Sequence, residues 1–447
     1  MDLQPSSTIK TYSYPNGEIQ RVQSVSLPDW TSLDFAKPLP NPGAFRQLCE
    51  LYENFIVPRA PYLFGTVAFF SLPEDMDMPF PMETKYGTVA NKLEAASIAL
   101  RSYMHNSRFS PDEKGRAFIE ELEKRGLFKM IKGKRPFHGR ILPVSGDMGL
   151  LSSLAGSSSL VANSSFFTMD MFDLGSPYDI IGRPIGLWVK DGVCTNPPLF
   201  EREALLVRKD GSVKIERPKL SDLSLEIGGK EYIPGKNCSL YERPHIRKAP
   251  GKGYSAAIAG NKVIASVKDF RMIIPSAGFI LKTKEYIPPG TEVIYHGFED
   301  VIFGIQVGNS IVRDGVPTKE FISYFSNIRN PFKLPIPPSL YPLDFEKARA
   351  PRMALGCGKD QRPVILWAEG PGKFDDLSIK GEFSCGASLS EMTDICQDLG
   401  LVNAINLDGG GSAQMIINGK RSLLISDRHI EDNSEYERSI PIGLMAK

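Results

Sequence analysis

The residues best suited to chemistry lie near the C-terminus, where Asp408 is followed by three glycines and Ser412. Glycines adopt backbone angles that are closed to other residues and let a ligand approach the main chain. Their N–H groups can form a concave anion site, while Asp408 would supply a general base, a nucleophile or a hydroxyl-binding group. A tight turn in which Asp408 bonds its own backbone also fits this pattern.

Local signals place this motif at the end of a strand. Ser388 and Glu391 have the spacing of a capping box and predict the start of a helix. Gly400 is suited to end that helix in the left-handed conformation. Residues 402–407 then predict a strand, which would deliver Asp408 to a glycine bend.

The glycine run matches neither of the common phosphate-binding loops. No lysine follows the glycines as in G-x-x-x-x-G-K-[ST], and there is no strand, G-x-G-x-x-G and helix unit. The 5 histidines are scattered, and the 6 cysteines include no C-x-x-C pair. The sequence therefore gives little support to a nucleoside-triphosphate site or a metal hydrolase, and we predict no cofactor and no metal.

Composition limits the partners. The chain has 447 residues, 53 lysines and arginines against 52 acids, and a net charge of +1. This balance gives no electrostatic case for nucleic acid or an anionic membrane surface, so we expect neither partner. A near-neutral net charge still allows a local basic patch. The sequence segment that most resembles such a patch is residues 132–135.

The sequence also predicts a cytoplasmic chain. No apolar run approaches the roughly 18 residues that span a bilayer. The first residues lack the basic start and apolar stretch of a signal peptide. We therefore expect a cytoplasmic location, unless a leader precedes this sequence, and reduced cysteines.

The two parts of the chain differ in their predicted secondary structure. Apolar spacing and capping residues predict helices over residues 43–55, about 88–104 and 110–126. From about residue 141 onward, short strands with turn signals prevail. We therefore expect an α+β fold, with a more helical N-terminal extension of unknown role over residues 1–134. A mixed, mostly antiparallel sheet domain with packed helices would occupy residues 135–447.

Particular strands support this description. Residues 204–208 and 213–215 flank a turn, and residues 364–368 form a short apolar run typical of a buried strand. In the N-terminal part, Pro15-Asn16-Gly17 predicts a hairpin turn.

The run Ala404–Ser412 (Ala-Ile-Asn-Leu-Asp-Gly-Gly-Gly-Ser) resembles the signature of the phosphodiester glycosidase family. Further segments resemble parts of this family in the family's order, at residues 161–167, 274–281, 311–315, 350–356 and 386–399. Together they span about residues 135–447, and the glycine motif with its preceding helix is the specific part. The resemblance implies a sheet domain of phosphodiester glycosidase type.

It also implies a hydrolase that cleaves the bond between the anomeric carbon of a sugar, such as an N-acetylhexosamine, and a phosphodiester. Sugar and phosphomonoester would be released. The chain departs from the family pattern at Ser164 and Ser165, which replace glycines, at Met353, which replaces threonine, and at Glu369, where aspartate is usual. The family is mostly exported, whereas no leader is seen here. These departures indicate a divergent member with a different substrate or altered chemistry.

The implied reaction sets what the site must contain. A phosphomonoester leaves readily because its second pKa is about 6. The site therefore needs positive potential at the phosphate, and a carboxylate that stabilises the oxocarbenium-like centre or activates water. We assign Asp408 and Glu369 as the carboxylates and Arg352 as the phosphate clamp, because guanidinium is a bidentate donor. The predicted substrate-binding residues are Asn163, Arg313, Asp314, Asn406, Gly409, Gly410, Gly411 and Ser412.

Two alternatives stay open. A phosphodiesterase could attack phosphorus in a nucleotide or sugar-phosphate diester, although such enzymes usually rely on metals. A non-catalytic protein could bind sugar phosphates on the same fold, although the unaltered Asp408 and Arg352 disfavour it. In each case the expected partner is a small sugar-phosphate or nucleotide-sugar-like molecule, and the oligomeric state is open.

Overall fold

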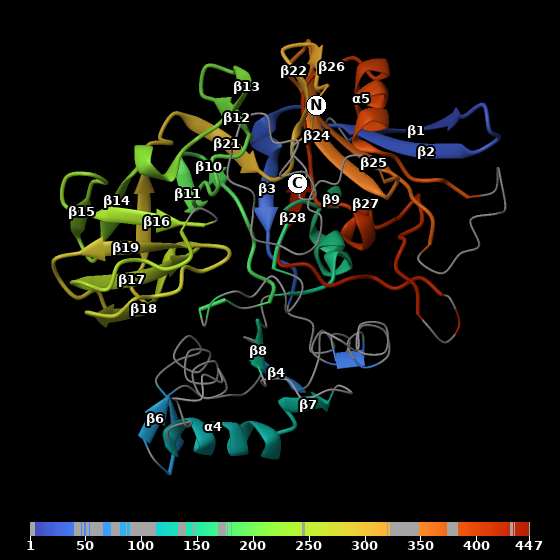
Figure 1. Ribbon diagram of the computed structural model, residues 1–447. Helices are drawn as coiled ribbons and strands as arrows, with labels where there is room; N and C mark the ends of the chain where they lie inside the picture. The colour runs from blue at the N-terminus through green and yellow to red at the C-terminus, as the bar shows by residue number, and fades with distance from the viewer. Residues whose placement is uncertain are drawn as a thin grey trace.

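The computed structural model describes most of the C-terminal two-thirds of the chain and parts of the N-terminal third. The described residues are 5–39, 46, 49–50, 53, 66–72, 81–85, 87–89, 113–132, 140–145, 148–168, 176, 178–179, 181–243, 246–319, 321, 348–372, 383–429, 432 and 434–446. Most of the helices predicted over 43–55 and 88–104, the first residues of the helix predicted over 110–126, and residues 133–135 of the basic run lie outside them. Within the described residues, antiparallel sheets dominate the architecture (Figure 1).

A seven-stranded antiparallel sheet carries the glycine motif, in the order β1-β2-β25-β24-β26-β22-β23. Its strands are β1 (Ser6–Ser13), β2 (Ile19–Ser26), β22 (Ser310–Arg313), β23 (Val316–Pro317), β24 (Arg352–Gly358), β25 (Pro363–Ala368) and β26 (Leu401–Asn406). Helix α5 (Leu389–Asp398) covers one face, where Met392 and Cys396 pack on Ala354 and Leu366. Its Ser388–Glu391 capping box is formed as predicted.

A small antiparallel sheet lies beside the glycine motif, in the order β27-β9-β28-β3. Its strands are β3 (Leu33–Ala36), β9 (Leu160–Asn163), β27 (Met415–Ile417) and β28 (Gly443–Ala446). The described residues also contain four short 3₁₀ turns, η1 (Trp30–Ser32), η3 (Leu151–Ser157), η4 (Leu220–Asp222) and η5 (Gly410–Ser412). Strand β9 therefore ends at Asn163, one of the predicted substrate-binding residues.

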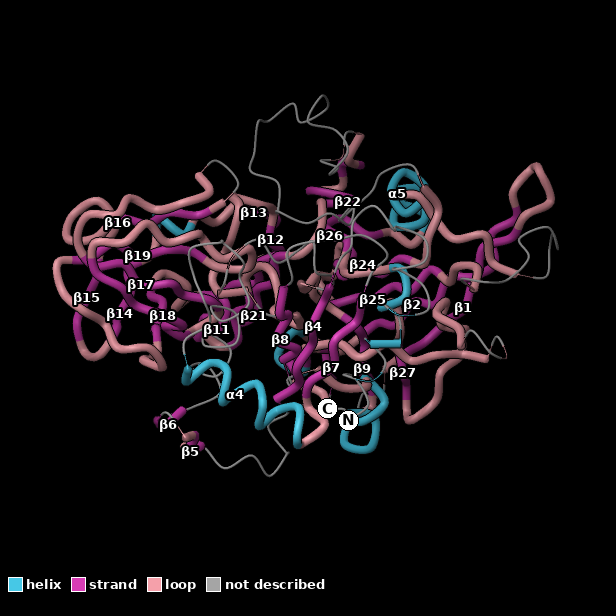
Figure 2. The backbone as a smooth tube through the Cα atoms, turned by 60° about the horizontal axis from the view of Figure 1, so that its bottom comes forward, coloured by secondary structure: helices cyan, strands magenta, loops and turns pink. Residues whose placement is uncertain are grey.

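The middle of the chain forms a lobe of two sheets, of eight and four strands. The larger sheet contains β10 (Trp188–Lys190), β11 (Val193–Asn196), β12 (Ala204–Arg208), β13 (Val213–Glu216), β14 (Ser224–Ile227), β15 (Lys230–Tyr232), β20 (Val293–His296) and β21 (Val301–Gln306). The smaller one contains β16 (Ser239–Glu242), β17 (Tyr254–Ala259), β18 (Lys262–Lys268) and β19 (Phe279–Thr283). In both views this lobe lies at one end of the molecule and the β1–β2 hairpin at the other (Figures 1 and 2).

The remaining elements come from the N-terminal third. They are β4 (Thr66–Leu72), β5 (Met82–Thr84), β6 (Gly87–Val89), α4 (Glu113–Lys124), β7 (Phe128–Lys132) and β8 (Arg140–Ser145). Strand β4 pairs antiparallel with β7 and parallel with β8. After α4, Gly126 adopts the left-handed conformation that its position predicted.

The predicted α+β fold with a more helical N-terminal extension is wrong. The protein is mostly antiparallel sheet, and in the described part of residues 1–134 seven strands accompany one fully described helix, α4. Strand β6 occupies the start of the helix predicted from residue 88. Strand formation depends on partners distant in sequence: β2 pairs with β25, and β3 with β28. These pairings cross the division at residues 134/135, which stays a prediction.

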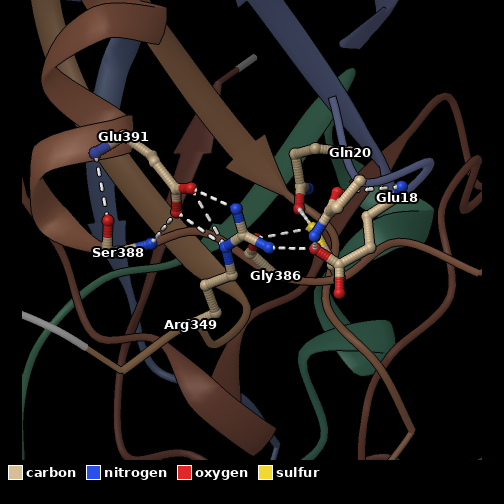
Figure 3. A network of polar contacts seen from close by, with 8 residues as sticks. Glu18, Gln20, Arg349, Gly386, Ser388 and Glu391 are labelled. Atoms are coloured by element: carbon tan, nitrogen blue, oxygen red, sulfur yellow. Dashed lines mark hydrogen bonds and ion pairs between the residues drawn. The ribbon is translucent and has the colours of Figure 1, made fainter. Parts of the chain in front are cut away.

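An arginine network ties the β1–β2 turn to helix α5 (Figure 3). Arg349 donates from Nε to a carboxylate oxygen of Glu391 at 3.0 Å, and it also forms an ion pair with Glu18. Its guanidinium lies 4.5 Å from the ring centre of Tyr14. Glu391 is the capping-box residue of α5, so one arginine links that helix start to the N-terminal hairpin.

Candidate active site

Asp408 is held between two sheets. After β26 the N–H of Leu407 donates to the carbonyl of Met353 in β24 at 2.8 Å, and the N–H of Asp408 donates to the carbonyl of Ser164 at 2.9 Å. Ser164 directly follows β9. The main chain is therefore fixed at Leu407 and at Asp408 itself, and Asp408 as a residue is partly buried.

Polar groups surround the Asp408 carboxyl. The Asn163 amide nitrogen donates to the Asp408 carbonyl at 2.9 Å and lies 3.5 Å from a carboxyl oxygen. Burial raises the pKa of Asp408 from 3.8 to about 7, although the Arg438 guanidinium, hydrogen bonds from Ser412 and Asn163, and the Gly409 N–H favour the ionised form. The carboxyl can therefore exchange a proton near neutral pH, as an acid–base catalyst requires.

The glycines are needed for close approach. A β-carbon at Gly409 would lie 2.6 Å from the carbonyl oxygen of Pro351, and Gly410 has a φ of +59°. A β-carbon at Gly411 would overlap the Arg438 guanidinium and the Asp427 carboxylate. The Gly410 N–H donates to Pro351 at 2.8 Å, so this amide already has a protein acceptor. Oxyanion binding by the glycine amides stays a prediction.

Arg438 and Asp427 were not predicted from the sequence. Nε of Arg438 donates to the Asp427 carboxylate at 2.7 Å, and Nη1 lies 3.5 Å from the hydroxyl of Ser412. Asp427 is 6% exposed. No local spacing marks this arginine, since it stands about 30 residues after the motif in an ordinary charged stretch. Only the fold brings a cation to Asp408.

Arg352, the predicted phosphate clamp, is 3% exposed and donates to main-chain carbonyls. Its Nε contacts Ala387 at 3.0 Å and one terminal nitrogen contacts Ala348 at 2.9 Å. These acceptors precede β24 and α5, so part of the guanidinium holds those two segments together.

Glu369, the predicted second carboxylate, is 1% exposed and forms a two-point ion pair with Arg21, at 2.6 and 2.8 Å. The Leu424 N–H donates to it at 2.8 Å, and the Ser384 hydroxyl is a further donor. Gly370 directly follows Glu369, Gly409 directly follows Asp408, and both glycines pack on Pro351. The two predicted carboxylates therefore lie on segments that share Pro351 as a neighbour. The catalytic roles of Glu369 and Arg352 stay predictions.

Two buried amide oxygens lie in the same region. Asn163 and Gln414 are both fully buried and are joined through their main chains at 3.0 Å. Within the described residues, neither side-chain oxygen has a hydrogen-bond partner. Asn406, also buried, is fixed by main-chain bonds to Gly308 and Asn309, each 2.9 Å long. Buried acceptors without partners are rare, so the first two are candidates for binding a ligand hydroxyl.

Arg313 and Asp314 are not brought to Asp408. Arg313 ends β22 and Asp314 begins the turn after it, and the N–H of the following Gly315 donates to Val402, at the start of β26, at 2.8 Å. Asp408 follows the opposite end of that strand. Arg313 forms an ion pair with Glu203, and Asp314 is an exposed turn residue with a φ of +49°.

The described residues contain no group of three or more histidine, cysteine, aspartate or glutamate side chains arranged to hold a metal ion. All six cysteines are free thiols. The groups assembled around Asp408 are therefore a carboxyl, a guanidinium, a hydroxyl and amides.

Comparison with known proteins identifies the same region. Residues 252–447 match the family model described as phosphodiester glycosidase, which confirms the resemblance over that part of the chain. The mouse (Mus musculus) N-acetylglucosamine-1-phosphodiester alpha-N-acetylglucosaminidase is 33% identical over 89 residues. That stretch is 20% of this chain and 15% of the mouse protein, so the match spans a small part of that relative.

Solved structures with a similar course of the chain include a hypothetical protein from Synechocystis, with a TM-score of 0.44 and 15% identity. That match covers 99% of this chain and 62% of the other. The zebrafish N-acetylglucosamine-1-phosphodiester alpha-N-acetylglucosaminidase catalytic domain, auto-inhibited by its pro-peptide, gives a TM-score of 0.41 and 13% identity over 99% of this chain and 82% of that one.

Proposed function

We propose that this protein is a glycosidase-type hydrolase that cleaves the bond between the anomeric carbon of a sugar and a phosphodiester. The observation that carries the proposal is the Asp408 carboxyl, whose pKa is raised to about 7 by burial and which lies near Arg438. A proton-exchanging carboxyl and a cation are the two groups that the reaction needs. Both lie within the residues that match the phosphodiester glycosidase family.

In the proposed reaction, a water oxygen attacks the anomeric carbon. The bond from that carbon to the phosphate oxygen breaks, and its electron pair leaves with the phosphate. The attacking water passes a proton to the ionised Asp408, which releases it to solvent or to the product, whose second pKa is about 6. A base with a pKa of about 7 suits this transfer near neutral pH.

Arg438 is the stronger candidate for the phosphate contact. Its guanidinium is oriented by Asp427 and lies beside Ser412 of the glycine motif. Arg352 instead donates to the carbonyls of Ala387 and Ala348. Guanidinium matches the geometry of phosphate oxygens, and a cation near the phosphate stabilises the charge that develops as the bond breaks.

The sugar class proposed is an N-acetylhexosamine linked through its anomeric carbon. The mouse relative acts, by its name, on an N-acetylglucosamine-1-phosphodiester. The buried amide oxygens of Asn163 and Gln414 are suited to accept hydrogen bonds from sugar hydroxyls. Ser164 and Ser165 lie next to Asn163, so the departures from the family pattern fall beside these proposed contacts.

The test is hydrolysis of an α-linked N-acetylhexosamine-1-phosphodiester in oxygen-18 water, with mass spectrometry of both products and Asp408→Asn as the matched control. Label in the released sugar, and its loss in the variant, supports the proposal. Label in the phosphate means attack at phosphorus and a phosphodiesterase instead. Saturable binding without turnover by the folded wild type would make the protein a sugar-phosphate binder. Parallel reactions with a chelator report whether a metal assists.

A further inference from the structure

Basic and aromatic residues gather at one end of the smaller sheet of the lobe. Strand β17 begins there with Tyr254, which pairs with Lys268 at the end of β18 and with Thr283 at the end of β19. The preceding segment runs beside residues 272–274, because Ala249 donates to Met272 at 2.9 Å. We call this region the basic end; it comprises residues 246–254, 268–271 and 282–286.

The basic end carries a strong local charge. It contains 7 lysines and arginines and only 2 acids, whereas the whole chain has a net charge of +1. Both acids are already bonded: Asp269 accepts from the Gly253 N–H at 2.8 Å, and Glu285 pairs with Lys230. Within the described residues, none of the exposed cations of the basic end forms an ion pair; they are Arg247, Lys248, Lys252, Lys268, Arg271 and Lys284.

Large apolar side chains project from the same region. Phe270 is 54% exposed, Tyr286 is 52% exposed and Ile246 is 43% exposed. Phe270 stands in the sequence Lys268-Asp269-Phe270-Arg271, with Arg271 as its direct neighbour and Lys268 two residues before it. Exposed aromatics beside unpaired cations indicate an interaction surface, because an isolated soluble domain gains nothing from exposing them together.

We propose that the basic end is a docking surface for an anionic lipid bilayer. Lysine and arginine are attracted to acidic headgroups, and each contributes about 1 kcal/mol near such a surface. Phenylalanine and isoleucine insert below the headgroups, while tyrosine lies at the interface between apolar and polar layers. The expectation of no membrane partner rested on the charge of the whole chain, and the basic end is a local exception to that charge.

Nucleic acid is the competing polyanion, and the ring geometry disfavours it. Single-stranded nucleic acids stack their bases on open aromatic faces. Here the Lys268 ammonium lies 5.4 Å from the centre of the Tyr254 ring, so that face is covered. Tyr254 and Tyr286 meet edge to face, with centroids 6.2 Å apart, and so form no flat platform.

The first experiment places a fluorescent reporter at Phe270 in the basic end. Trp30, Trp188 and Trp367 are all buried, at 5%, 6% and 0% exposure, so Phe270→Trp adds an exposed fluorophore over a constant background. With phosphatidylcholine vesicles that contain phosphatidylserine, the emission of this variant should shift to shorter wavelength. No shift should occur with phosphatidylcholine alone or with wild type. An equal shift with both vesicle types, or none with either, overturns the proposal.

The second experiment removes charge. Lys268→Gln/Arg271→Gln should weaken co-sedimentation with the acidic vesicles about thirtyfold, as the loss of two surface cations implies. The matched control is Lys214→Gln, an exposed lysine on β13 outside the basic end, which should bind like wild type. Circular dichroism checks the fold of each variant. Unchanged binding by the double variant, or binding of a single-stranded oligonucleotide in preference to vesicles, would reject a lipid surface.

Discussion

Arg438 packs directly on the main chain at Gly411, where a β-carbon would overlap its guanidinium and the Asp427 carboxylate. The last glycine of the motif therefore makes room for a protein cation. This contact explains why the run ends in glycine and why Ser412 lies beside Arg438.

Gly411→Ala should separate these groups and lower kcat/KM by at least about a hundredfold, since small displacements of a positioned group cost that much. Hydrolysis of the sugar-1-phosphodiester measures the effect. Gly156→Ala is the control, because a β-carbon at Gly156 meets no atom within 4 Å, and it should retain wild-type rates. A fully active Gly411→Ala protein would show that the close packing is dispensable.

Asp408→Asn should lower turnover by about a hundredfold to ten-thousandfold, the usual contribution of an acid–base group. It should also stabilise the protein above neutral pH. The folded pKa of about 7 exceeds the ordinary value of 3.8, so the folded state binds more protons between these values and loses stability as pH rises through them.

The gain in free energy of unfolding for Asp408→Asn should therefore grow between about pH 4 and 7 and then level off, on the order of 4 kcal/mol. Urea titrations at pH 4, 6 and 8 measure it. A gain that is constant across this range would mean that the Asp408 pKa is not raised by folding.

Arg438→Gln should shift the pH dependence of the reaction. The Arg438 charge lowers the pKa of Asp408. Without this charge the pKa should rise, so the increase of kcat with pH should occur above neutral pH. The KM for the anionic substrate should also increase. Arg438→Lys should restore part of both. Arg421→Gln, which removes ion pairs with Glu435 at 3.2 Å and with Glu437 at 3.5 Å, should leave the profile in place. If activity instead falls with rising pH, Asp408 acts as the acid.

Arg349→Met should lower the free energy of unfolding by about 1 to 3 kcal/mol, because this partly buried guanidinium bonds both Glu18 and Glu391. A double-mutant cycle with Glu391→Gln isolates the pair, with urea midpoints as the readout. Arg362→Met is the comparison, since its pair with Asp360 is 3.8 Å long and exposed, and it should change stability little. Strict additivity in the cycle would argue against a coupled network.

Local signals allowed part of this structure to be predicted. The capping box at Ser388, the strand before Asp408 and the turn at residues 15–17 each depend on neighbouring residues, and all are present. The strands predicted at 204–208 and 213–215, on either side of a turn, also form, as β12 and β13. Strands β3, β4 and β7 of the N-terminal third were missed, because β3 pairs with β28 and β4 pairs with β7 and β8, all remote from them along the chain.

The site residues likewise fall into those that the local sequence revealed and those that only the fold brings together. Asp408 and the glycines were found because they are contiguous, and their resemblance to a family was specific. Arg438 and Asp427 reach Asp408 only through the folded chain. Arg313 and Asp314 were chosen from a weakly similar segment, and they lie at the end of β22 and in the turn after it, beside the far end of β26.

The pairing of β2 with β25 also constrains the order in which the molecule can assemble. Val22 lies opposite Ala368, so β2 waits for roughly 340 further residues, which at ribosomal speeds takes about 20 to 70 s. Both sheets of the lobe are built from strands between residues 188 and 306, so they can close during that interval. Asp408 follows β26, the last strand of the seven-stranded sheet along the chain, so that sheet can be completed only when the segment that carries the carboxylate emerges.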